Sequence, residues 1–177
     1  LSQTKNAAVL NAIGFANGNP DAKNGDAAYA IDKLKLATQI KGMKDPNVWV
    51  NLGDAYAELT DGGNAILSYQ EALRLNSNYA CAIFRIGRIY SSQGVGQKEL
   101  FLKYFEEAVK TDSHYGPVYF ALFNYYYEYE PDKAEVYLNK WIAESEKEPK
   151  ACYYRALLEY RQSKFNEAVA KDQDRKS

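Results

Sequence analysis

Few residues in this 177-residue chain have the type and spacing needed for chemistry. Residues 94–98, Gly-Val-Gly-Gln-Lys, contain the glycines and the lysine of a phosphate-binding loop. They lack the four-residue gap between the glycines and the Ser or Thr that follows the lysine in such loops. We therefore interpret this segment as a turn between helices.

Other reactive side chains are equally scattered. Cys81 and Cys152 fall in different repeats of the pattern described below, too far apart for a disulfide, so both are expected to be free and partly buried. No base is placed to activate either thiolate, so neither is expected to be catalytic. The single histidine, His114, cannot form a histidine metal site or supply a histidine pair. Carboxylates such as Glu106 and Glu128 are expected on solvated helix faces. The sequence thus predicts no catalytic residues, no metal and no cofactor, and we expect the protein not to be an enzyme.

Composition narrows the classes of partner. The net charge is −1 and the basic residues do not cluster, so a nucleic-acid partner is not expected. No apolar run approaches the length of a membrane span, so membrane insertion is not expected. We expect a soluble protein, for which cytoplasm and periplasm both stay open. Because the chain starts at Leu1 rather than Met, something upstream is expected to have been removed.

The clearest pattern lies in residues 47–80. Two sets of residues are spaced as on one face of an amphipathic helix: Trp49, Leu52, Gly53 and Tyr56, then Ala65, Tyr69 and Ala72. Between them, residues 61–64 (Asp-Gly-Gly-Asn) favour a turn and offer a helix cap. A helix hairpin is therefore predicted. Glycine inside a helix costs about 1 kcal/mol relative to alanine, so Gly53 predicts a close approach of the two helices.

The order and spacing of these seven residues resemble the pattern of the tetratricopeptide repeat (TPR) family. Members of this family repeat a helix–turn–helix unit of 34 residues. Ser77 stands where the usual closing proline would be. The resemblance implies an all-α fold, an α-solenoid of stacked antiparallel helix hairpins that forms a right-handed superhelix.

Weaker copies of the pattern flank the clearest repeat. A long loop is expected after Asn17, and Phe123 and Trp141 replace small residues in the fourth copy. The last copy has a second helix with Phe165 and Ala168, after which the pattern is lost. All five prolines fall at predicted boundaries. We predict a single repeat domain over residues 1–177, part of a longer protein, with repeats at about 7–45, 46–79, 80–114, 115–148 and 149–177.

The first helix of each hairpin is expected to line a concave groove. The positions that directly follow the residues of the core stripe on each first helix should face this groove. In the second repeat these positions are Val50, Asp54, Ala57 and Glu58. Aromatics and arginines dominate interface energetics. The candidate groove residues are Phe84, Arg88, Phe120, Asn124, Tyr127, Tyr154 and Arg161. For Phe84, Phe120 and Tyr154, simple packing between neighbouring helices is an equal alternative.

Some TPR proteins clamp the C-terminal carboxylates of chaperones, using a Lys followed four residues later by Asn. The matching pairs here are Val50 with Asp54, and Phe84 with Arg88. That mode of binding is therefore not expected.

The resemblance implies a non-enzymatic protein–protein interaction module that binds a peptide or a partner protein in its concave groove. Two alternatives stay open. One is a structural scaffold that self-associates through its open C-terminal repeat. The other is a regulatory TPR domain of a larger protein.

Overall fold

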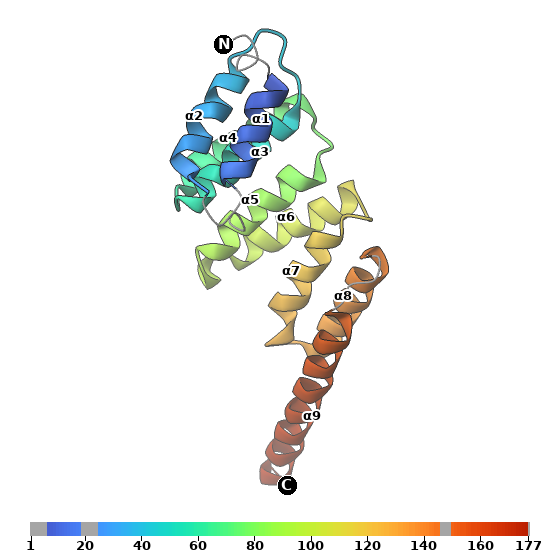
Figure 1. Cartoon of the computed structure of the whole chain (residues 1–177). Coiled ribbons are helices and arrows are strands. Elements are labelled where there is room, and N and C mark those ends of the chain that lie inside the picture. The colour runs from blue at the N-terminus through green and yellow to red at the C-terminus, as the bar shows by residue number, and fades with distance from the viewer. Residues whose placement is uncertain (1–6, 19–24, 146–149, 177) are drawn as a thin grey trace. The chain divides into compact units, whose positions relative to one another are not determined.

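The computed structural model describes residues 7–18, 25–145 and 150–176 (Figure 1). Within these ranges the chain forms nine α-helices, one short 3-10 helix and no strand, so the predicted all-α fold is confirmed. The elements are α1 (Ala7–Gly18), α2 (Ala27–Thr38), α3 (Pro46–Glu58), α4 (Gly62–Leu75), α5 (Ala80–Ser92), η2 (Val95–Gln97), α6 (Lys98–Thr111), α7 (Gly116–Tyr127), α8 (Pro131–Glu144) and α9 (Ala151–Lys176).

The chain divides into two compact units, Leu1–Ser113 and His114–Ser177. The first unit contains three helix hairpins, α1/α2, α3/α4 and α5/α6, and each packs against the next through α2 with α3 and α4 with α5. The second unit contains the hairpin α7/α8, with α9 packed against α8. Hairpins in contact with their neighbours along the chain form the predicted α-solenoid. The single domain over residues 1–177 stays a prediction.

Helices begin where the sequence supplies caps. Asp61 accepts a hydrogen bond from the backbone N–H of Asn64 at 3.1 Å, which satisfies one of the unpaired donors at the start of α4. Asp45 caps α3 in the same way. Pro46 and Pro131 are the first residues of α3 and α8, where a missing N–H costs nothing. The cap predicted between the two stripes is therefore confirmed.

Part of the predicted loop after Asn17 lies outside the described residues, as do Pro20 and Pro149. Among the described helices, none combines the length and the apolar character needed to cross a bilayer.

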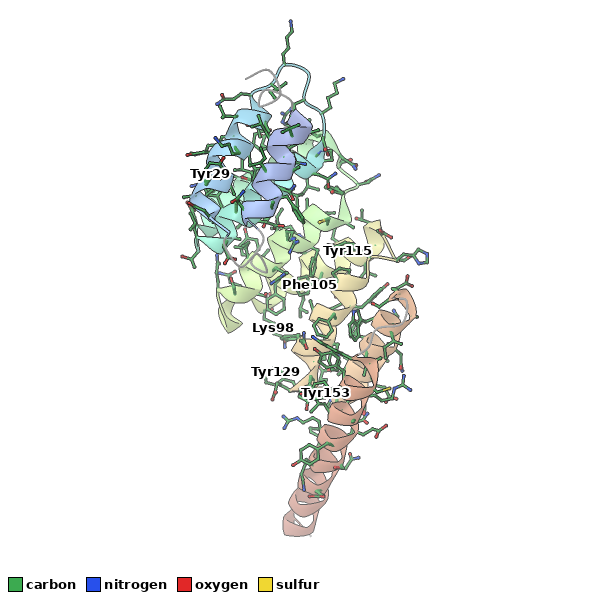
Figure 2. All side chains as sticks on the ribbon, in the orientation of Figure 1. Tyr29, Lys98, Phe105, Tyr115, Tyr129 and Tyr153 are labelled. Carbon is green, nitrogen blue, oxygen red and sulfur yellow. The ribbon has the colours of Figure 1, made fainter. Side chains whose placement is uncertain are left out.

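Glycines bring the two helices of each early hairpin together. A Cβ on Gly53 would overlap the ring of Tyr69, which crosses from α4 and is buried. A Cβ on Gly87 would lie 2.8 Å from the ring of Phe105, well inside the roughly 3.5–4.0 Å at which carbon atoms pack best. Phe105 lies between α5 and α6 in Figure 2. The predicted close approach at Gly53 is therefore a general feature of the first unit.

The second unit fills the same positions with rings. Phe123 stands in place of the glycine and is 2% exposed. The ring of Phe120 lies 4.7 Å from that of Trp141 and 5.1 Å from that of Tyr154, measured between centroids. These rings come from α7, α8 and α9, so aromatic packing joins the three helices.

The prediction of a separate second helix in the last repeat is wrong. Residues expected in it, such as Phe165, belong to α9, which runs unbroken from Ala151 to Lys176. No glycine or proline lies between those two residues, so nothing in the sequence interrupts the helix.

Replacing Gly53 with Ala should lower the free energy of unfolding by about 1–3 kcal/mol, because the added methyl group overlaps the buried ring of Tyr69. This range is the net change, after the gain of about 1 kcal/mol in helix propensity that alanine brings. Urea denaturation followed by circular dichroism measures it. The matched control is Gly63→Ala, where the nearest atom to a new Cβ is 3.7 Å away and no loss is expected. Equal losses at both positions would contradict the packing role of Gly53.

Candidate functional site

A hollow with a volume of about 500 Å³ opens in the first unit. Nearly all of its lining comes from α1, α3 and α5, the first helices of three successive hairpins. This is the side on which a groove is expected in repeats of this kind. The lining residues are Gly14, Phe15, Gly18, Asn51, Asp54, Ala57, Glu58, Tyr69, Arg85, Arg88, Ile89 and Ser92.

A polar network from three helices lies in this hollow. The hydroxyl of Tyr69 donates a hydrogen bond to Oδ1 of Asp54 at 2.7 Å. The Arg85 guanidinium lies 3.1 Å from Oδ2 of the same carboxylate, with both side chains about a third exposed or less. Asp54 on α3 thus connects α4 to α5.

Burial and neighbouring charges shift the pKa of Asp54 in opposite directions. Burial raises the pKa of Asp54, while the charge of Arg85 and the hydrogen bond from Tyr69 oppose that rise. Burial also raises the pKa of Tyr69, and the adjacent Asp54 raises it further. The phenol therefore keeps its proton and acts as a hydrogen-bond donor.

The rest of the lining offers contacts of two kinds. Phe15 is 56% exposed and Ile89 is half-buried, which provides apolar surface. Arg88 and Glu58 are exposed and carry opposite charges. In the part of the chain that the structure describes, Arg85 pairs with Asp54, whereas Arg88 forms no such close ion pair, although its charge also lowers the pKa of Asp54.

The predicted groove positions in the first unit have mixed outcomes. Asp54, Ala57 and Glu58 line the hollow, as does Arg88. Phe84 is 4% exposed and lies 5.4 Å from Phe105 between ring centroids, so it belongs to the core rather than to the groove surface. Among the alternatives for Phe84, packing between helices is the one that fits.

Val50 is also misplaced by the prediction, because it is buried in a cluster with Ala82 and Ile86. These two residues belong to α5, so the side of α3 that carries Val50 meets the next hairpin. Positions 50 and 84 are therefore occupied by contacts between hairpins.

The other candidates fall in the second unit and contact one another. Phe120 and Tyr154 are half-buried in the aromatic packing described above. The hydroxyl of Tyr127 donates to the carbonyl oxygen of Leu157 at 3.3 Å. These contacts hold α9 against α7.

Two candidates at this end of the second unit carry polar side chains. Arg161 donates to the carbonyl oxygen of Glu128 at 2.9 Å and forms an ion pair with its side chain at 3.2 Å. Asn124 is exposed. Arg161 therefore also connects α9 to the end of α7.

Sequence reasoning missed Phe15, Asn51 and Arg85. Phe15 directly follows Gly14 as Asp54 follows Gly53, so the same spacing rule applied to the first repeat finds it. Asn51 and Arg85 each directly follow a predicted groove position, Val50 and Phe84 respectively. A broader arc of each first helix would have included them.

The residues with reactive groups lie elsewhere. The predicted turn at 94–98 is confirmed: Gly94 has a positive φ of 96°, η2 follows, and α6 begins at Lys98. Cys81 and Cys152 are both free thiols; Cys81 is half-buried as predicted, but Cys152 is exposed. No group of His, Cys, Asp and Glu side chains among the described residues is arranged to hold a metal ion.

Helix hairpins that pack against their sequence neighbours define a helical-repeat protein of the α-solenoid class. Residues 46–79 match the tetratricopeptide repeat family. The resemblance seen in the sequence is thereby confirmed. No curated protein matches the chain.

Several solved structures share the fold. A crystal structure of MamA is 22% identical, with a TM-score of 0.61 over 84% of each chain. A MamA structure from Desulfovibrio magneticus RS-1 is 18% identical, with a TM-score of 0.60 over 97% of each chain. The APC/C hetero-tetramer Cut9–Hcn1 gives a TM-score of 0.66 at 18% identity, covering 89% of this chain and 30% of that one. At these identities the likeness concerns the fold.

Replacing Tyr69 with Phe should lower the free energy of unfolding by about 1–2 kcal/mol, because the change removes the hydrogen bond to the Asp54 carboxylate and keeps the ring. Thermal and urea unfolding measure the loss. Tyr90→Phe is the matched control: the Tyr90 ring stacks on Tyr104, and its hydroxyl makes no hydrogen bond within the described residues. If both variants lose equally, the network with Asp54 is not the cause.

Proposed function

We propose that the chain is a non-enzymatic protein-interaction module that binds a segment of a partner protein in the hollow of the first unit. The observation that supports this most is the lining of the hollow by three successive first helices. Its volume of about 500 Å³ lies within the range of about 300–1,000 Å³ typical of ligand sites. Repeat proteins use such surfaces for extended ligands.

The lining suggests the chemistry of the ligand. An apolar side chain of the partner would pack on Phe15, Ala57 and Ile89. An acidic group would pair with Arg88, because Asp54 already neutralises Arg85. We therefore propose an extended peptide segment with an acidic residue close to an apolar one.

Binding without catalysis fits the side chains in the hollow. Its lining contains no cysteine and no histidine. The carboxylate of Asp54 is engaged by Tyr69 and Arg85, which leaves it poorly placed to act as a general base. These contacts hold Asp54, Tyr69 and Arg85 in place on the surface of the hollow. Asn124, in the other unit, stays a separate candidate for binding.

Peptides selected from a displayed library of random dodecapeptides should bind the intact chain and compete with one another. Arg88→Glu and Phe15→Ala should each weaken a selected peptide more than tenfold, because arginine and aromatic side chains that a ligand buries dominate the energy of interfaces. Titration calorimetry measures the change. Lys103→Glu is the control, an equal charge reversal on an exposed residue of α6 outside the hollow. Peptides whose affinity depends on Lys103 and not on Arg88 would contradict this site.

A self-associating scaffold is the second candidate function. It is favoured by a separate feature, the exposed face of α9, which lies in the other unit.

A further inference from the structure

The polar network in the hollow of the first unit is arranged like a binding site for an acidic group, although the group that occupies it belongs to the chain itself. The hydroxyl of Tyr69 donates to Oδ1 of Asp54 at 2.7 Å, and the Arg85 guanidinium lies 3.1 Å from Oδ2. Both oxygens of one carboxylate are thus held by side chains of two other helices. Guanidinium groups recognise carboxylates in this way at binding sites.

A ligand in the hollow can reach this network. The side chains of Arg85 and Asp54 are 31% and 27% exposed, and both line the hollow. Arg88 stands one turn further along α5, is exposed, and lines the hollow as well. Its charge reaches Asp54, because it helps to lower the pKa of that carboxyl group. An acidic group of a ligand therefore meets two arginines and, beside them, the carboxylate that they already attract.

The ionised carboxylate of Asp54 works against such a ligand. An acidic group close enough to pair with Arg85 lies close to Asp54 too, and like charges side by side at an interface disfavour binding. Neutralising Asp54 has the opposite effect. Arg85 is then a largely buried cation without its counterion, which is a costly arrangement. An acidic group of the ligand restores the pairing.

Burial makes the neutral form of Asp54 easier to reach. It raises the pKa of the carboxyl group, and the opposing effects of Arg85, Tyr69 and Arg88 do not cancel this rise. Asp54 is therefore protonated at a higher pH than an exposed aspartate. A negative charge placed next to it by a ligand raises the pKa further.

The groups that face Asp54 from α4 and α5 do not take up protons in its place. Tyr69 of α4 keeps its phenol proton, because burial raises its pKa. Arg85 and Arg88 of α5 keep their charge. On α3 itself, Glu58 is exposed one turn beyond Asp54 and lines the hollow, so it is the other acid that a ligand can affect.

The remaining neighbours are less involved. Tyr79, which precedes α5, also senses the charge of Asp54, but burial is the main reason that its pKa is raised. Residues 7–18 of α1 contain no ionisable side chain. Asp32 of α2 acts on Lys35 of its own helix. The lysines of α2 lie over tyrosine rings, Lys33 over Tyr29 and Lys35 over Tyr56.

We propose that Asp54 competes with the ligand for Arg85, so that the hollow binds an acidic group of its partner together with a proton. The proposal rests on the function proposed above. Ionised Asp54 holds Arg85 and repels the acidic group. When Asp54 takes a proton from solvent, Arg85 and Arg88 both pair with the ligand, and Tyr69 still donates to the neutral carboxyl group. Because proton and ligand binding are linked, affinity rises as the pH falls.

Titration calorimetry of the intact chain tests this coupling. The probe is a dodecapeptide selected as described above and resynthesised with cysteic acid as its one acidic residue and an amidated C-terminus, because a sulfonate stays ionised throughout the range. Its affinity should rise as the pH falls from about 7.5 to about 4.5. Titrations in two buffers of different ionisation enthalpy should show net proton uptake on binding.

Asp54→Asn removes the charge of the competitor and keeps an oxygen that accepts hydrogen bonds from Tyr69 and Arg85. At pH 7 this variant should bind the probe at least about tenfold more tightly than the unmodified chain, without proton uptake. Asp32→Asn is the matched control, since Asp32 is exposed on α2 and outside the hollow. It should change neither quantity. Circular dichroism confirms that the helices are retained.

Two results would overturn the inference and leave the proposed function in place. One is binding that depends on Arg88 but takes up no proton and is not tightened by Asp54→Asn. The other is proton uptake that Glu58→Gln abolishes, which would make Glu58 the acid concerned. If Asp54→Asn does not fold, proton uptake by the unmodified chain and by Glu58→Gln decides. Peptides that bind independently of Arg88 would instead contradict the proposed function, and the inference with it.

Discussion

The structure depends most on the contact between Gly53 and the ring of Tyr69. Because Gly53 has no Cβ, the ring lies directly on α3, and the phenol oxygen beyond it reaches Asp54, the next residue of that helix. The same carboxylate binds Arg85 of α5. A single absent methyl group thus sets the spacing of one hairpin, links it to the next and shapes one wall of the hollow.

Most of the fold could be predicted because it is encoded locally. Apolar stripes, helix caps and boundary prolines act within one or two helical turns. The hairpin of residues 46–79 can therefore be predicted without the rest of the chain. The burial of Phe84 is harder to predict, because a ring at the position next to the core stripe can face either solvent or the next hairpin. The unbroken α9 shows a further limit: a second-helix pattern forms a hairpin only when a turn precedes it.

The same limit applies to the candidate groove residues of the fourth and fifth repeats. For Phe120 and Tyr154 the sequence leaves ligand contact and packing between helices equally open, and the structure places both rings between helices. Phe123 in place of a glycine leaves room that only large side chains can occupy. In the first unit, glycines close that space, and the exposed side chains, such as Phe15 and Arg88, surround a hollow.

Contacts that join only nearby elements also have a kinetic consequence. In the first unit every principal contact links helices that are adjacent or next but one in the chain, so folding closes only short loops. Chains with such local contacts fold quickly. The first hairpins can therefore fold on one another while later residues are still being synthesised, and their exposed edge then serves as the template on which the following hairpin docks.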